Sequence, residues 1–281
     1  MYLIAESGST KTQWSLVDKD KILKLVNTSG INPLNLTPAE IQTYIRPLSN
    51  YVENQRIDAI YFFGAGCASP SAIRKIESAL SETFNCEKIF VDSDLIAACL
   101  ALAGTKKGIV GLLGTGSNSC VWDGVKVTVK IPSLGYVLGD EGGGVAIGKQ
   151  LLTDYLKFQM PALIRDKFAE KYKISAEKVV ERVYQMPMPN RYLAGFAPFA
   201  EANIDDTYCY NVVKSQFESF FAKNIFLYPD YQKKDLYFCG SIAHAHADIL
   251  DSIVEENGLK IKKIVKEPID GLAEYFQKLM G

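Results

Sequence analysis

One local pattern occurs twice in this chain and constrains its fold more than any other feature. In each copy an apolar run is followed by a short turn of small residues and then by a second apolar run. The first copy covers residues 2–18, with the turn SGSTKT at 7–12, and the second covers residues 109–122, with the turn GTGS at 114–117. Apolar runs this short, bounded by glycines, predict buried strands. Because each copy opens roughly half of the chain, the repetition predicts a duplicated architecture with a phosphate held between the halves.

The two turns have the chemistry of a phosphate site. They are rich in N–H and hydroxyl donors and contain no carboxylate. Successive backbone N–H groups form an anion-binding nest, and glycine lets a backbone approach another group closely. The same residues also favour ordinary hairpin turns for conformational reasons. Lys11 in the first copy favours the phosphate interpretation, in which it neutralises phosphate charge; the alternative is a solvated turn lysine.

Length and composition limit the classes of protein. A chain of 281 residues predicts one large domain or two of medium size. With a net charge of −1 and a pI of about 6.2, no basic surface for nucleic acid is expected. No apolar run approaches the ~18 residues of a membrane span. The chain enters a strand at Tyr2 without a signal sequence, and its six scattered cysteines contain no C-x-x-C pair, so buried thiols in a cytoplasmic protein are expected.

Strands alternate with helices along most of the chain, which predicts an α/β fold. Thr37 and Glu40 form a capping box for a helix that Pro47 should kink or split.

A polar break at 104–107 separates an N-terminal lobe, 1–104, from a C-terminal lobe, 105–267. In the second lobe we expect a return strand at 125–131, a glycine-rich loop at 135–144, a helical region over 145–227 and a single helix at 242–256. A terminal helix, 268–281, should pack back on the first lobe, while His244 and His246 are expected to be surface or packing residues.

Several polar residues lie where strands give way to helices or loops. Asp94 follows a strand ending at Val91 and lies in the first turn of the next helix, where the macrodipole favours its ionised form. An ionised aspartate can accept the proton of a hydroxyl during phosphoryl transfer; alternatively Asp92 or Ser93 caps the helix and Asp94 is its N-terminal charge. Asp140 and Glu141 could bind substrate hydroxyls or could be helix N-terminal charges. Glu6 ends the first strand and could reach Mg²⁺ through water, since this ion keeps several waters.

Four short segments resemble one known family. The segment IAESGSTKT at 4–12 is similar to the first phosphate loop of the actin-like ATPase superfamily, which includes sugar kinases. LGTGSN at 113–118 is similar to the second phosphate loop, and FCGS at 238–241 to the adenosine segment. With GDEG at 139–142, the set resembles the N-acetylglucosamine kinase branch, grouped with the BadF/BadG/BcrA/BcrD ATPases. The segments occur in the family's order over essentially the whole chain.

The resemblance implies two ribonuclease-H-like domains, with ATP and sugar in the cleft, and it implies a role for particular residues. Asp94 matches the general base, and Asn32, Asp94 and Asp140 match sugar-hydroxyl ligands. Glu6 stands where the family usually has an aspartate that contacts the metal. The positions that match ATP contacts are Gly8, Ser9, Thr10, Lys11, Thr12, Gly114, Thr115, Gly116 and Ser117, with Gly240 and Ser241 on the nucleoside side.

The function expected from these residues is ATP- and Mg²⁺-dependent phosphorylation of an amino sugar, foremost N-acetylglucosamine at its primary hydroxyl. Glucosamine and N-acetylmuramic acid stay open as acceptors because loops outside the motifs shape the pocket, and a homodimer stays open as well. Two other functions remain: an ATPase that drives a partner protein, as in the activator branch of the family, and a non-catalytic nucleotide or sugar sensor.

Overall fold

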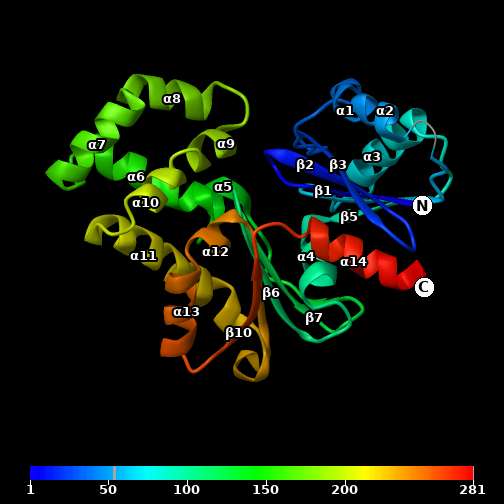
Figure 1. Cartoon of the computed structure of the whole chain (residues 1–281). Helices are drawn as coiled ribbons and strands as arrows, with labels where there is room; N and C mark the ends of the chain where they lie inside the picture. The colour runs from blue at the N-terminus through cyan, green and yellow to red at the C-terminus, as the bar shows by residue number, and fades with distance from the viewer. Residues whose placement is uncertain (53–54, 281) are drawn as a thin grey trace. The chain divides into compact units, whose positions relative to one another are not determined.

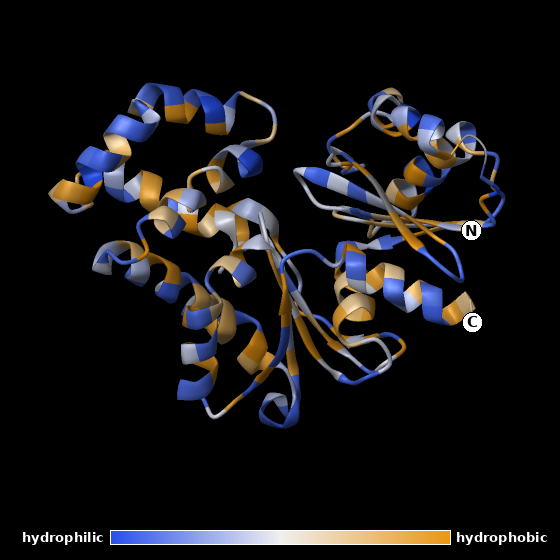
Figure 2. Cartoon of the chain, in the orientation of Figure 1, coloured by the Kyte–Doolittle hydropathy of each residue, from blue (hydrophilic) through white to orange (hydrophobic). Residues whose placement is uncertain are grey.

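The computed structural model describes residues 1–52 and 55–280, and within these ranges the chain forms two compact units (Figure 1). The first comprises Met1–Lys106, Asp123–Val127 and Glu267–Gly281, and the second comprises Lys107–Trp122 and Thr128–Lys266. Each unit is built around one five-stranded mixed sheet. Apolar residues run along the strands of both sheets, whereas most helices alternate between apolar and polar residues (Figure 2).

The sheet of the first unit has the order β3-β2-β1-β4-β5. β1 (Tyr2–Ser7), β2 (Lys11–Val17) and β3 (Ile22–Ser29) form an antiparallel meander. β4 (Ala59–Gly64) lies parallel to β1, and β5 (Ile89–Ser93) lies parallel to β4 at the sheet edge. Glu6 pairs with Gln13 of β2 and Phe63 of β4, so its side chain shares a sheet face with theirs.

The helices of the first unit follow local signals in the sequence. Thr37 and Glu40 form the predicted capping box of α1 (Pro38–Ile45). Pro47 ends that helix as predicted, because the chain continues as a 3₁₀ turn, η1 (Arg46–Leu48), and a short helix, α2 (Ser49–Val52). The other helices of this unit are α3 (Pro70–Thr83), α4 (Asp94–Leu102) and α14 (Ile269–Met280), and α14 packs on α4, β1 and β2.

The sheet of the second unit has the order β10-β9-β6-β7-β8. β6 (Gly108–Leu113) and β7 (Ser117–Trp122) are antiparallel, while β9 (Leu236–Cys239) is parallel to β6 and to β10 (Ile261–Val265). β8 (Val127–Val129) is shorter than the predicted strand at 125–131. The late start has a local reason: the Asp123 carboxylate accepts hydrogen bonds from the N–H groups of Val125 and Lys126, each at 2.8 Å, and so holds both in the turn.

Helices make up most of the remaining second unit. The loop predicted at 135–144 contains a single helical turn, α5 (Gly135–Leu138), closed by a bond from Gly139 N–H to the Gly135 carbonyl and too short to give a periodic pattern. The predicted helical region contains α6 (Gly144–Leu156), α7 (Ala162–Tyr172), α8 (Ala176–Tyr184), α9 (Pro189–Ala194), α10 (Ala197–Ala202), α11 (Thr207–Lys223) and the 3₁₀ turn η2 (Ile225–Leu227); a further 3₁₀ turn, η3 (Tyr231–Lys233), follows it.

The single helix predicted at 242–256 is wrong. The structure has α12 (Ser241–Ala245) and α13 (Ala247–Glu256), separated by His246, whose backbone is not helical. The imidazole is buried and makes an edge-type contact with the ring of Phe217, which confirms its packing role, and burial lowers its pKa. All six cysteines are buried, as predicted. None of the described helices is both long and apolar enough to cross a membrane.

Candidate functional site

The first donor-rich turn connects β1 to β2 and is braced by the end of β3. Gly8 N–H donates to the Lys11 carbonyl at 3.0 Å, and Gly30 N–H donates to the Thr10 carbonyl at 3.0 Å. A Cβ on Gly30 would lie 2.5 Å from the Gly8 carbonyl oxygen, so only glycine permits this approach. The turn is therefore held in shape by backbone contacts, and Ser9 at its tip remains half-buried.

Two hydroxyl groups below the turn hold it to the sheet. Ser7 Oγ lies 2.7 Å from Thr12 Oγ1, both side chains are buried, and both accept hydrogen bonds from Ile31 N–H. Thr12, predicted to contact phosphate, therefore has a buried hydroxyl that braces the loop. Thr10 is exposed, and Lys11 is partly exposed on the same hairpin.

A group of charged side chains surrounds this hairpin within the first unit. Lys11 forms an ion pair with Glu267, which lies two residues before the start of α14. The pKa of Glu6 rises to about 8, first because the carboxyl is buried and then because the carboxylates of Asp94 and Glu267 are near; Lys11 partly opposes the rise. The structure thus brings together three residues that the sequence predicted: Glu6, Lys11 and Asp94. It adds Glu267, which no local motif indicated.

Asp94 is the first residue of α4, as predicted. Ser93 occupies the N-cap position, but its side chain makes no capping hydrogen bond. The Asp92 carboxylate accepts a hydrogen bond from Ser93 N–H at 2.7 Å and is exposed. Ser93 therefore does not cap the helix through its side chain, and Asp94 supplies the acidic side chain of the first turn. Burial, with Asp94 and Asp92 nearby, raises the pKa of the Cys67 thiol to about 12, which leaves this cysteine a neutral packing residue.

Asn32 lies in the loop after β3, in the same unit as Asp94. Its Oδ1 accepts a hydrogen bond from Leu34 N–H at 3.0 Å. That oxygen also lies 2.3 Å from the point where a Cβ on Gly66 would be, and Gly66 has a φ of +83°. The side chain of Asn32 is therefore placed by a turn and by a close glycine contact, and it stays half-buried.

The second donor-rich turn connects β6 to β7 and is held by the start of α6. Gly144 N–H donates to the Gly114 carbonyl at 2.8 Å, and Val145 N–H donates to the Thr115 carbonyl at 2.9 Å. Gly240, with a φ of +122°, also lies against this region, since a Cβ there would be 2.2 Å from the Leu113 carbonyl oxygen. The predicted adenosine segment thus lies against the start of the second phosphate loop at a close backbone approach that requires glycine.

Asp140 is a structural partner of the second turn. Its Oδ1 accepts a hydrogen bond from Ser117 N–H at 3.0 Å and lies 2.4 Å from the position of a Cβ on Gly116. The residue is buried with a φ of +62°, four residues before α6 begins, so it is not a charge in the first turn of that helix. Burial raises its pKa, although the hydrogen bond from Ser117 opposes that rise.

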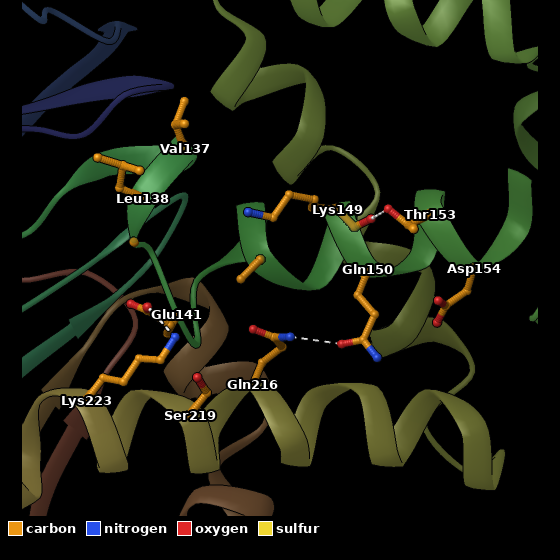
Figure 3. Close-up of a pocket in the computed structure, with 12 residues that line it drawn as sticks. Val137, Leu138, Glu141, Lys149, Gln150, Thr153, Asp154, Gln216, Ser219 and Lys223 are labelled. Carbon is orange, nitrogen blue, oxygen red and sulfur yellow. Dashed lines mark hydrogen bonds and ion pairs between the residues drawn. The ribbon is translucent and has the colours of Figure 1, made fainter. Parts of the chain in front are cut away.

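A polar cavity of about 510 Å³ adjoins Glu141 in the second unit. In Figure 3, Lys149, Gln150 and Thr153 of α6 lie opposite Gln216, Ser219 and Lys223 of α11. Lys223 forms an ion pair with Glu141 at 3.0 Å, and Gln216 donates to Gln150 at 2.8 Å. Val137 and Leu138 supply largely exposed apolar surface at its edge. The sequence did not predict this cavity, because its walls come from helices about 70 residues apart.

Comparison with known proteins supports this fold. No family model and no curated protein matches the chain. Among solved structures, a candidate N-acetylglucosamine kinase from Porphyromonas gingivalis is 37% identical, with a TM-score of 0.92 over 99% of both chains. A candidate N-acetylglucosamine kinase from Chromobacterium violaceum is 16% identical, with a TM-score of 0.76 over 98% of both chains. A ROK family glucokinase from Streptomyces griseus, in complex with glucose and AMPPNP, is 12% identical, with a TM-score of 0.52 over 97% of both chains.

The last two structures bear on the fold alone, and they confirm the predicted two-domain actin-like ATPase architecture. The P. gingivalis structure also bears on ancestry, because its sequence identity of 37% to this chain extends over 99% of both chains. The chain therefore belongs to the family of N-acetylglucosamine kinase-like proteins.

Proposed function

We propose that the protein is an ATP-dependent kinase that phosphorylates an amino sugar on its primary hydroxyl, with N-acetylglucosamine as the leading acceptor. The observation that carries the proposal is the group formed by Lys11, Glu6 and Asp94 beside the first donor-rich turn. Phosphoryl transfer depends mainly on positioning and on stabilising charge, and a lysine next to backbone donors supplies both. The choice of sugar rests on the P. gingivalis relative and on the motifs.

Asp94 would act as the general base. It lies at the N-terminus of α4, where the helix dipole stabilises a negative charge. A carboxylate there can accept the proton of a sugar hydroxyl as that oxygen attacks the γ-phosphorus and ADP leaves. Asn32, from the same unit, would contribute a sugar contact.

Glu6 fits a magnesium ion held through water. Its pKa of about 8 reflects a carboxyl group that is buried near two other carboxylates, a setting that a cation would stabilise. Within residues 1–52 and 55–280, no group of three or more histidine, cysteine or acidic side chains could hold a metal ion alone. Mg²⁺ usually takes one or two carboxylates together with waters and phosphates. When bound, the ion would neutralise charge on the transferring phosphoryl group.

The second turn would bind the remaining nucleotide phosphates through Gly114, Thr115, Gly116 and Ser117. We place the nucleoside beside Gly240 and Ser241 and toward the cavity next to Glu141. The cavity volume of about 510 Å³ suits a ligand of nucleoside size. In this proposal the main role of Asp140 is indirect: its carboxylate accepts a hydrogen bond from Ser117 N–H and so fixes the turn that binds the nucleotide. A direct contact between Asp140 and the sugar hydroxyls is the less important role.

An acceptor screen tests the function. ADP release is measured with glucosamine, N-acetylglucosamine, N-acetylmuramic acid, N-acetylmannosamine and glucose. We expect the largest kcat/KM with N-acetylglucosamine. ADP release without any sugar would instead favour a partner-driving ATPase, and nucleotide or sugar binding without ADP release would favour a sensor.

A substitution tests the mechanism. Asp94→Asn should lower kcat about 10²–10⁴-fold while ATP still binds, which is the usual contribution of a general base. The matched control is Asp92→Asn, since Asp92 is exposed, lies two residues earlier and should leave kcat nearly unchanged. A wild-type rate in the Asp94→Asn variant would show that this residue is not the base.

A further inference from the structure

Lys11 already has an anionic partner before any nucleotide binds. Its ammonium group pairs with the Glu267 carboxylate, and both side chains are partly exposed, at 43% and 31%. A lysine ammonium is a compact point charge that a phosphate oxygen can also bind. A bound phosphate and the Glu267 carboxylate would therefore compete for the ammonium group of Lys11.

Packing fixes Glu267 in front of this lysine. Glu267 is the first residue of the first unit after the chain leaves the second unit at Lys266. Pro268 follows it and is buried, and α14 begins at the next residue. A Cβ on Gly271 would lie 2.6 Å from the Ala101 carbonyl oxygen, so the first turn of α14 packs directly on α4. The backbone that carries Glu267 thus leads directly into a tightly packed helix start.

The surrounding charge opposes a second anion. The Glu267 carboxylate pairs with Lys11, and the Asp94 carboxylate lies near the same group of charged side chains. A nucleotide phosphate that approaches Lys11 meets both a competing carboxylate and like charge. Removing the charge of Glu267 would weaken both the competition for Lys11 and the repulsion of the incoming phosphate.

We propose that Glu267 is an internal competitor of the nucleotide phosphates for Lys11, so that nucleotide binding exchanges one anionic partner of this lysine for another. The inference rests on the proposed function, in which Lys11 binds phosphate. Beyond that function, the inference makes Glu267 a positioning residue that weakens nucleotide binding by occupying Lys11. The exchange also occurs at the point where the chain passes between its two units.

A double-mutant cycle tests the exchange. The Kd of ADP is measured by calorimetry for the wild type, Glu267→Gln, Lys11→Met and the double variant, at 50 mM and 500 mM KCl. Glu267→Gln should tighten ADP binding about 2- to 5-fold, the range expected for losing a partly exposed ion pair. The gain should shrink in the Lys11→Met background and at high salt, because salt screens exposed charges. A purely structural role would not make the gain depend on Lys11.

Glu256→Gln is the matched control, because Glu256 also pairs with a lysine, Lys214, at 3.1 Å but in the second unit. It should leave the Kd of ADP unchanged. Unchanged or weaker binding in Glu267→Gln, or an equal gain with and without Lys11, would overturn the inference and leave the kinase proposal intact. If the wild-type protein binds no adenine nucleotide, both proposals are wrong.

Discussion

Replacing Glu6 with glutamine should remove a pH dependence of stability that the fold creates. The pKa of Glu6 rises to about 8 in the folded protein from an ordinary value of 4.5, chiefly through burial. Between these two values the folded protein keeps the proton on Glu6 and the unfolded chain releases it. The free energy of unfolding therefore falls as pH rises through this window and levels off above pH 8. Glutamine has a similar shape and no titration, so Glu6→Gln should lack this decline.

The size of the effect follows from the pKa. Each pH unit in the window is worth about 1.4 kcal/mol, which gives an upper bound of about 5 kcal/mol. Because the Glu6 residue as a whole keeps some solvent exposure although its carboxyl group is buried, we expect about 2–4 kcal/mol after solvent screening. The advantage of Glu6→Gln over the wild type should grow by this amount between pH 5 and pH 8.5.

The assay is urea denaturation of nucleotide-free protein in EDTA at pH 5, 7 and 8.5. Glu274→Gln serves as the control, since Glu274 is an exposed glutamate on α14 and should not change the pH profile. Parallel profiles for the wild type and Glu6→Gln would refute the reasoning. So would a wild type that gains stability over Glu6→Gln as pH rises.

Substitutions at three further positions test the packing of the second unit by chemical denaturation. Asp140→Ala should cost about 1–3 kcal/mol because Ser117 N–H loses its acceptor, whereas Asp140→Asn keeps an acceptor and should restore most of that loss. Gly148→Ala should cost about 3 kcal/mol, since the new Cβ would lie 1.9 Å from the Leu193 carbonyl oxygen of α9. Tyr228→Phe should cost about 1–3 kcal/mol, because its buried hydroxyl bonds Ser119 and Ile131.

Each of these predictions has a direct control. Lys149→Ala changes an exposed residue next to Gly148 on the same helix and should alter stability by less than about 0.5 kcal/mol. Tyr184→Phe removes a hydroxyl from a tyrosine that is 80% exposed and should be equally neutral. If Asp140→Asn were as unstable as Asp140→Ala, the hydrogen bond to Ser117 would not be the cause.

Much of the fold could be predicted because its signals are local. The capping box at Thr37 and Glu40 and the break at Pro47 act within one or two helical turns. The two donor-rich turns are marked by adjacent glycine and hydroxyl residues. The return strand was predicted too long because a carboxylate turn at Asp123 holds its expected first residues, and α5 was missed because a single helical turn leaves no periodic pattern.

The sequence alone determined the α/β elements, the two turns and the candidate residues at strand ends. These features depend on neighbouring residues, which set the backbone conformation and the spacing of buried side chains along a strand or helix. Only the tertiary structure decided which groups share an environment. Lys11 meets Glu267 across 256 positions of chain, and Asp140 reaches back 23 positions to Ser117. Ion pairs, pKa values and cavities depend on distances through space, which only the packing of sheets and helices creates.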